Sequence, residues 1–424
     1  MAIAVNRHII ALTKADKLFD RIAKEVYEGK LDGEQLDEEL NNFVATHLMN
    51  GVTEGYGKGF AEVDYNTPDA EMMARLEQDV YWFSSAKTYN ELVELNLALV
   101  DDSGAIRSFV DFKQAAAAIH DRYNVRYLQT EYNQAIASSQ MAGKWVRIQE
   151  DKEILPLLRF NTVGDKRVRP EHAMLEGITK PVDDPFWDTY YPPLSWNCRC
   201  DVDQVAEGNI TPDDKVRTPE LPDVFKDNVG KKGIVYPKEH PYHELPDVVD
   251  KIRINQKAAE LLNKNTQAYH HLQSFKNGGR VEVHSLADKS DLEYNIDLST
   301  EIARKGRKMR IRPHSTLEGV KNPEIEHKGL TGDFKETKAS GSSNALQSHI
   351  KSAAKQKADS VWLYLTHEDL TINNIKKGLY ASLHNPTWNK TIKKVMLIYK
   401  DFEVVELDRK EIANWSFVKK LREP

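Results

Sequence analysis

A proline- and aromatic-rich segment near the middle of the chain, Pro185–Val202 (PFWDTYYPPLSWNCRCDV), restricts the possible folds more than any other stretch. Pro192 and Pro193 lack amide donors, so neither a helix nor a central strand can pass through them. The large aromatic residues of this segment need burial: Trp187, Tyr190, Tyr191 and Trp196. We therefore expect an extended segment held in a core, from which Cys198–Val202 leaves as a short strand.

Long runs of helical periodicity precede this segment. Apolar residues recur at helical spacing in residues 12–60, 69–100 and 111–147. Residues 145–205 instead hold short β-prone runs separated by Gly, Asp and Pro, which is typical of a small α+β unit. The sequence predicts a multidomain chain that begins with a mainly helical module containing a small α+β part, residues 1–205.

The remainder of the chain differs in composition. Residues 206–250 contain six prolines, which predict a connector lying over the surface of the first module. Residues 251–424 predict a helix over Lys251–Ser274, then alternating strands and helices that form an α/β domain with a mixed sheet of about five strands.

Charge is also divided between the two parts. Residues 251–424 hold 31 Lys and Arg against 21 Asp and Glu, whereas residues 1–250 hold 28 against 44. A basic surface suits a polyanionic partner such as nucleic acid, because neutralising phosphates releases condensed counterions. The sequence thus predicts an acidic body joined to a basic C-terminal domain.

No apolar run approaches the roughly 20 residues that cross a bilayer, so we expect no membrane span. The first twenty residues are interrupted by Arg7, His8, Lys14 and Asp16, which is atypical of a secretory signal. These features predict a product of the cytoplasm.

The two cysteines, Cys198 and Cys200, lie one residue apart. Neighbours at this spacing on a strand point to opposite faces, so a disulfide between them would strain the backbone. Two interpretations remain open. The thiols are buried small side chains, or they form a structural Zn²⁺ site that His172 or another histidine completes.

Residues 165–202, DKRVRPEHAMLEGITKPVDDPFWDTYYPPLSWNCRCDV, resemble the signature of the phage Mu protein F-like family of minor head, or head-morphogenesis, proteins. TEYNQAIASSQMAGKW and GIVYPKEHPYH fit the same family, so the resemblance covers roughly residues 10–245. It implies a structural role at the portal region of a tailed-phage procapsid, with the portal and other head proteins as partners. It places the protein in the bacterial host cytoplasm and in the procapsid or virion head.

A charged hairpin in the basic domain carries candidate chemistry. Asp333 and Lys335 are two apart on a predicted strand, so both point to one face. Glu324, which follows Pro323 on the neighbouring strand, can project to the same face. Two carboxylates suit a divalent cation such as Mg²⁺ or Mn²⁺, and the lysine can orient or deprotonate an attacking water.

This layout is similar to that of PD-(D/E)XK nucleases, with Glu where Asp is usual and Asp where Glu is usual. Residues 321–365 also resemble the C-terminal nuclease domains of contact-dependent growth-inhibition toxins, several of which cut tRNA. The resemblance, within residues 280–410, implies Glu301 as an additional catalytic acid and an immunity protein as a partner. It predicts metal-assisted hydrolysis of RNA or DNA, with Glu324 and Asp333 as metal ligands.

Substrate contacts are expected beside this site. The candidates are Arg310 and Arg312, from a basic run that begins at Arg304, together with Gln347 and His349. Two alternatives remain open. One is a purely structural capsid protein whose basic domain binds nucleic acid without cleaving it. The other is a metal-independent RNase of the barnase, EndoU or RelE type, with acid–base histidines drawn from His284, His314, His327 and His349.

Overall fold

The computed structural model describes residues 2–33 and 35–424, with side chains in the first helix described from Ala15 onward. The chain forms two compact units, Met1–Thr266 and Gln267–Pro424. The division falls later than the expected boundary at 250/251, because helix α9 (Val248–Asn265) packs on α3 (Pro68–Leu97) of the first unit, with Trp82 Nε1 donating to Asn255 Oδ1 at 2.9 Å. The helix predicted over Lys251–Ser274 therefore ends early, and its last residues form strand β4 (Tyr269–Ser274).

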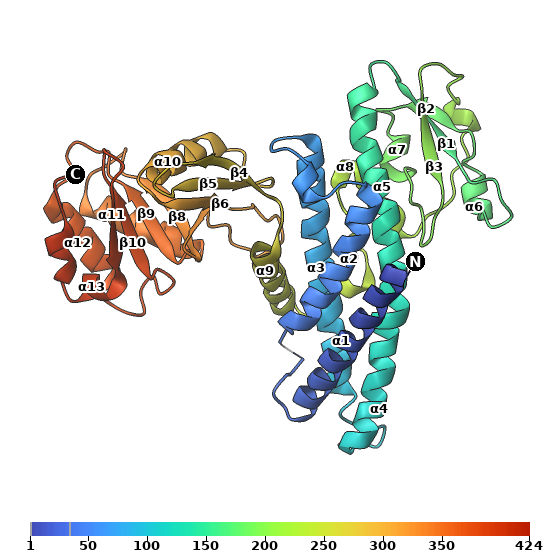
Figure 1. The fold of residues 1–424 in the computed structure, drawn as a ribbon, viewed down its shortest axis with the longest axis horizontal. Coiled ribbons are helices and arrows are strands. Elements are labelled where there is room, and N and C mark those ends of the chain that lie inside the picture. Colours follow the sequence, from blue (N-terminus) through green and yellow to red (C-terminus); the bar gives the residue numbers. More distant parts are fainter. Residues whose placement is uncertain (1, 34) are drawn as a thin grey trace. The chain divides into compact units, whose positions relative to one another are not determined.

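The first unit is mainly helical, as predicted (Figure 1). Its long helices are α1 (Ala2–Tyr27), α2 (Glu38–Tyr56), α3 (Pro68–Leu97), α4 (Phe109–His120), α5 (Leu128–Asp151) and α9. A π-helical segment, Asp121–Tyr127, joins α4 to α5. Side chains cap the helix starts, where four amides lack intrahelical partners: Asp37 accepts from Leu40 N at 2.8 Å, and Thr67 accepts from Ala70 N at 3.2 Å.

Helices α2 and α5 cross closely because α2 presents glycine at the contact. A Cβ atom on Gly55 would lie 2.1 Å from the Ile136 carbonyl oxygen, so no larger residue fits there. Val44, Leu48 and Val52 of α2 are completely buried in the same interior. Figure 1 shows the two helices side by side.

The small α+β part holds the aromatic segment. Its sheet has the order β2-β1-β3 and consists of β1 (Leu157–Asn161), β2 (Thr179–Pro181) and β3 (Asp201–Val205), with short helices α6 (Pro170–Ala173) and α7 (Phe186–Thr189). Trp187 and Tyr191 are fully buried, and the Tyr191 hydroxyl donates to Met141 O at 2.9 Å. The predicted burial is confirmed for these two residues, whereas Tyr190 and Trp196 are only partly buried. The segment is not wholly extended, since Phe186–Thr189 is helical, and its strand begins at Asp201.

The proline-rich residues 206–250 do not lie entirely on the surface. They include the short helix α8 (Val229–Lys232), after which Val235 and Tyr236 enter the interior. The amides of both residues donate to Asp79 Oδ2, at 2.8 and 2.9 Å, and the Tyr236 ring stacks on Phe83 with centroids 3.8 Å apart. This half of the predicted connector is therefore part of the core of the first unit.

The second unit is an α/β domain, as predicted, with an eight-stranded mixed sheet rather than one of about five strands. The strand order is β11-β10-β9-β8-β7-β6-β5-β4. The remaining strands are β5 (Arg280–His284), β6 (Lys308–Ile311), β7 (Ile325–His327), β8 (Leu330–Glu336), β9 (Ser360–Tyr364), β10 (Lys394–Ile398) and β11 (Val404–Asp408). β5 runs parallel to β6, and β8, β9 and β10 run parallel to one another, whereas the other pairs are antiparallel.

Helices cover both faces of this sheet. Helices α11 (Ser343–Lys355), α12 (Ile372–Leu383) and α13 (Arg409–Ala413) share a core with alternate sheet residues such as Val361 and Leu397. Helix α10 (Leu292–Arg304) packs against β5 and β6. It covers the sheet face opposite to α11 and α12, where its Tyr294 hydroxyl lies 3.5 Å from Glu336 Oε2 on β8. Across the described residues, no helix combines the length and the hydrophobicity that crossing a bilayer requires.

Candidate functional site

A cavity of about 240 Å³ lies where β7 and β8 separate. The β7–β8 ladder ends at the pair Ile325 and Gly332, so the following residues of β8 have no backbone partner on that side. The carboxylate of Glu324 takes this place, and its Oε2 accepts from Phe334 N at 3.0 Å. The sheet thus opens at the point where the charged residues of the hairpin lie.

Three charged side chains of the hairpin line this cavity together. Lys335 Nζ lies 2.6 Å from Asp333 Oδ2 and 3.8 Å from Glu324 Oε1. Asp333 is buried, with 1% of its surface exposed. Burial and the neighbouring Asp333 charge raise the pKa of Glu324 above its usual value, and the Lys335 ammonium opposes this shift. The convergence expected from the alternation of the hairpin is present in the structure.

Further polar groups reach the cavity from both covering layers. They are Asp288, Asp291 and Asn295 at the start of α10, His314 after β6, Asn322 before β7, and Ser352 and Gln356 at the end of α11. Sequence reasoning missed Asp288, Asp291, Asn295 and Ser352 as site residues. For Asp288, Asp291 and Asn295 the signal was the polar segment between β5 and α10, since the parallel β5 and β6 end at the same edge of the sheet.

Glu301 does not line the cavity. It lies on α10 and pairs with Arg304, with Oε1 3.2 Å from Arg304 Nε. Asn295, six residues earlier on the same helix, points to the cavity instead. At about 100° per residue the two positions lie far apart around the helix. The sequence pattern located the correct helix but the wrong position on it.

The four predicted substrate contacts lie in different surroundings. Arg312 lines the cavity, is buried and donates to Pro323 O at 2.9 Å. Arg310 lies outside it and pairs with Glu282 at 2.5 Å.

The two α11 residues of this group also differ. Gln347 donates to Asn344 at 3.3 Å and does not line the cavity. His349 is half-buried near Lys335, and burial together with that ammonium lowers the pKa of His349.

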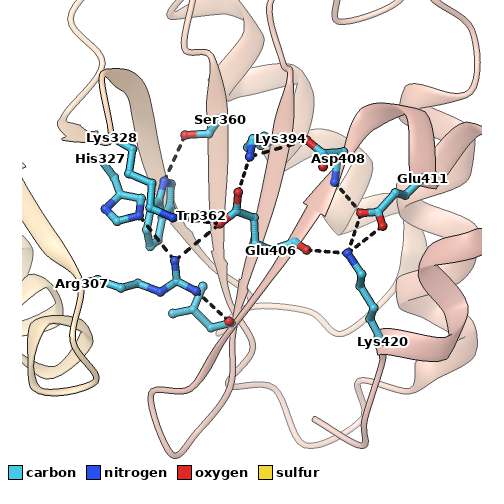
Figure 2. A network of polar contacts seen from close by, with 11 residues as sticks. Arg307, His327, Lys328, Ser360, Trp362, Lys394, Glu406, Asp408, Glu411 and Lys420 are labelled. Carbon is cyan, nitrogen blue, oxygen red and sulfur yellow. Dashed lines mark hydrogen bonds and ion pairs between the residues drawn. The ribbon is translucent and has the colours of Figure 1, made fainter. Parts of the chain in front are cut away.

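The basic run beginning at Arg304 is largely engaged within the unit. Lys305 pairs with Glu403 at 3.3 Å, and Arg307 lies 3.7 Å from Glu406 and donates to Val404 O at 3.0 Å. Figure 2 shows Glu406 between Arg307, Lys328 and Lys394, which neutralise it from three sides. These charges bind β11 to its neighbours, so they do not form the free phosphate-binding face that the run suggested.

The four histidines considered for metal-independent catalysis are dispersed. His284 is buried, and its Nδ1 accepts from Leu286 N at 3.0 Å. His327 is buried edge-on against Trp362 and contacts Lys308 O at 2.8 Å. His314 lines the cavity, with Nδ1 3.2 Å from Asp288 Oδ2.

A second cluster lies in the first unit. The ligand atoms of His172, Cys198 and Cys200 lie within 4.8 Å of one another, and His172 Nδ1 is 3.7 Å from Cys198 Sγ and 3.5 Å from Cys200 Sγ. Both thiols are free, and a hydrogen bond from the Cys200 thiol to the Cys198 sulfur lowers the pKa of Cys198 and raises that of Cys200. The arrangement brings together the two thiols and the histidine that the sequence pattern had suggested.

Comparisons with known proteins match these two regions separately. Residues 105–203 match the family described as Phage Mu protein F like protein, and residues 321–404 match the Contact-dependent growth inhibition CdiA C-terminal domain. The first match includes the cysteine–histidine cluster, and the second includes the charged hairpin. Both resemblances predicted from the sequence are confirmed.

Curated relatives support the first of these matches. The chain is 40% identical over 77 residues to the Putative capsid assembly protein F of Escherichia phage Mu, which is 18% of each protein. It is 38% identical over 66 residues to the Mu-like prophage FluMu F protein of Haemophilus influenzae, which is 16% of each. The chain therefore spans less than a fifth of the length of these relatives. No solved structure matches significantly.

Proposed function

We propose that this chain is a phage head-morphogenesis protein whose C-terminal unit is a toxin-like nuclease that hydrolyses phosphodiester bonds of RNA, including tRNA, or of DNA. The observation that carries the proposal is the meeting of Glu324, Asp333 and Lys335 in one cavity. Structural ion pairs are more often solvated or closed by packing. Here two carboxylates and an ammonium line one cavity instead.

The donor set fits a divalent cation such as Mg²⁺ or Mn²⁺. The neighbouring Asp333 charge raises the pKa of Glu324, and a cation between the two carboxylates would relieve this repulsion. Both are hard oxygen donors, and the remaining cavity leaves room for water and a phosphate oxygen. When bound, the cation would supply positive charge to the scissile phosphate and increase the acidity of water.

The residues of the chain have separate roles in this proposal. Lys335 orients the attacking water by donating a hydrogen bond to its oxygen, because its ammonium is already placed beside both carboxylates. Arg312, buried at the cavity wall, provides fixed positive charge for the substrate phosphate. Gln356 and Ser352 offer hydrogen bonds from α11, and His349 provides a further contact near Lys335.

The test is incubation of the purified full-length chain with tRNA and with plasmid DNA, in Mg²⁺, in Mn²⁺ and in EDTA. Cleavage that needs the cation and is lost in Lys335→Ala supports the proposal. Cleavage that persists in EDTA would instead favour metal-independent hydrolysis, for which the His314–Asp288 pair at the cavity is the specific candidate. No cleavage, with nucleic-acid binding retained, would favour the purely structural role.

We also propose that His172, Cys198 and Cys200 bind a structural Zn²⁺ ion. The three donors are soft, converge within ligand distance of a common point and join the α6 helix to the segment before β3. Cys200 is half-buried, so a fourth ligand can come from solvent on its side. Metal analysis of the purified chain should find zinc, which the Cys198→Ser and Cys200→Ser variants lose. Equal zinc in these variants would rule out this site.

The partners and location follow from the same proposal. The first unit would assemble with the portal and other head proteins, and the second would meet nucleic acid and an immunity protein in the bacterial host cytoplasm. Co-purification of the chain with procapsids from a lysogen, and its absence from heads of a mutant lacking residues 105–203, would test the first part.

A further inference from the structure

A strip of aromatic side chains lies at the surface of the second unit, and none of its residues lines the cavity. It consists of Tyr380, His384, Trp388 and Trp415, and we name it the aromatic strip. Neighbouring ring centroids are 4.6 Å apart for Tyr380 and Trp415, 4.7 Å for Tyr380 and His384, and 5.4 Å for His384 and Trp388. Trp388 is 52% exposed and Trp415 44% exposed. Leaving two such large rings in contact with water is unfavourable. Single exposed apolar residues are common on protein surfaces, but a continuous row of exposed rings is typical of a binding site.

The loop that carries Trp388 is held in a fixed shape. The Arg409 guanidinium donates to four backbone carbonyls of this loop, those of Asn385, Trp388, Asn389 and Ile392, at 2.7, 2.5, 2.8 and 3.1 Å. Asn389 closes the loop by donating to Ser382 O at 3.1 Å. A loop whose backbone is bonded in this way presents its tryptophan at little further entropic cost.

Trp415 is also held in an unusual conformation. Its backbone has φ 64° and ψ 5°, in the left-handed region that bulky residues rarely adopt. The next elements fix this position, because Phe417 is fully buried and α13 packs beside α12 (Figure 1). Strain of this kind is retained where a side chain must be displayed in one place.

The segment that carries Tyr380, His384 and Trp388 holds charge of one sign, whereas Glu411 on α13 pairs with Lys420. Residues 370–400 contain six lysines and neither Asp nor Glu. Lys376 and Lys377 lie one turn before Tyr380 on α12, Lys390 follows Trp388, and Lys410 lies on α13. Among the described residues, none of these four lysines is paired with a carboxylate. Exposed rings flanked by unpaired lysines are the combination that binds single strands, in which bases stack on rings and phosphates meet ammonium groups.

The strip is connected to the wall of the cavity. Thr391, in the loop after Trp388, donates to Ala354 O at 3.5 Å. Ala354 lies two residues before Gln356, which lines the cavity. A single nucleic-acid strand stacked on the aromatic strip would therefore lie beside the C-terminal end of α11, the helix that also contributes Gln356 to the cavity.

We propose that the aromatic strip is a stacking platform for unpaired bases of single-stranded nucleic acid, which makes unpaired nucleotides the preferred substrate of the second unit. The substrate part rests on the proposed nuclease function, whereas the binding part does not require cleavage. Duplex bases are already stacked, so the platform discriminates against duplexes. If the strip instead bound a protein, its rings would contribute nothing to the binding of single-stranded nucleic acid. The experiment therefore measures whether single-strand affinity depends on these rings.

The test measures fluorescence anisotropy of labelled U12, dT12 and a 12-base-pair duplex with the full-length chain in EDTA, which prevents metal-dependent cleavage. Each stacked base contributes about 1–3 kcal/mol by alanine substitution. The Trp388→Ala/Trp415→Ala variant should therefore bind U12 or dT12 at least about tenfold more weakly, with its duplex binding unchanged. The matched Trp388→Phe/Trp415→Phe variant, which keeps both rings, should stay within about threefold of wild type. Lys377→Gln/Lys390→Gln should reduce the salt dependence of binding by roughly two phosphate contacts.

The stacking platform can be overturned independently of the proposed nuclease function. Equal single-strand affinity in wild type and the double alanine variant, or no single-strand binding by wild type, overturns the platform. An equal loss for the duplex and the single strands overturns it as well, because that loss would report unfolding or charge alone. If no protein cleaves nucleic acid but binding still depends on the tryptophans, the nuclease assignment fails and the platform stands.

Discussion

Asp79 makes the folding of the first unit sensitive to pH. It is buried on α3, and its Oδ2 accepts hydrogen bonds from the Val235 and Tyr236 amides. Burial raises the pKa of Asp79 from 3.8 to about 7, although the two amides oppose the shift. The folded state therefore binds a proton between these pKa values that the unfolded state releases. Stability contributed by this group is present below pH 4 and is lost as pH rises through about 7.

The magnitude follows from the shift. About three pKa units at 1.36 kcal/mol each correspond to a loss of about 4 kcal/mol between pH 4 and pH 8, as an upper value. Asp79→Asn removes the titration and keeps an oxygen for the amides. The stability of this variant relative to wild type should rise with pH. Hydrogen exchange of the Val235 and Tyr236 amides, corrected for intrinsic rates, measures the opening free energy directly.

A matched control has the opposite sign. Burial opposes ionisation of Asp69 also, but hydrogen bonds from Lys58 and Tyr56 lower the pKa of Asp69 below its usual value. Its contribution is present above the unfolded pKa and is lost as pH falls through the folded pKa, so Asp69→Asn should be costly at pH 7 and less costly at acid pH. An Asp79→Asn difference that stays constant within about 1 kcal/mol from pH 4 to pH 8 would refute the reasoning for Asp79.

Three further perturbations test the packing. Lys87 is completely buried and pairs with Glu131, so Lys87→Met should destabilise the chain by about 3–5 kcal/mol, and Lys87→Met/Glu131→Leu should recover much of this in thermal unfolding. Gly230→Ala would place a Cβ 2.1 Å from Trp145 Cβ, so it should cost about 1–3 kcal/mol, whereas Gly104→Ala, in open space, should show only the smaller cost of its positive φ. Arg409→Ala frees the Asn385–Ile392 loop, so trypsin should cut after Lys390 faster than in wild type; equal cutting would show that the guanidinium does not hold this loop.

The candidate hairpin could be predicted from the sequence because its information is local. Alternation placed Asp333 and Lys335 on one face, and the Pro323–Glu324 pair indicated where the neighbouring strand begins. Which side of a helix faces the sheet depends on tertiary packing and cannot be predicted from neighbouring residues in the sequence. Glu301 was therefore assigned to the site, although Asn295 occupies that position.

The errors in the fold have the same origin. Tyr269–Ser274 continues a polar helical pattern, but its backbone pairs with β5 and forms an edge strand. Residues 235–236 follow many prolines, but the carboxylate of Asp79, more than 150 residues earlier, binds their amides in the core. Partners this distant in sequence leave no trace in local periodicity, so burial of the second half of the connector could not be predicted.

The catalytic role of the cavity is tested most directly by comparing Asp333 and Lys335, which line the cavity, with Glu301, which does not. Initial rates of cleavage of labelled tRNA and single-stranded DNA are measured in Mg²⁺ for wild type, Asp333→Asn, Lys335→Ala and Glu301→Gln. The account predicts that the first two variants lose at least about a hundredfold in rate, as expected when a group that acts in the transition state is removed, while Glu301→Gln, outside the cavity, cleaves like wild type. Undiminished cleavage by Lys335→Ala and Asp333→Asn would contradict it.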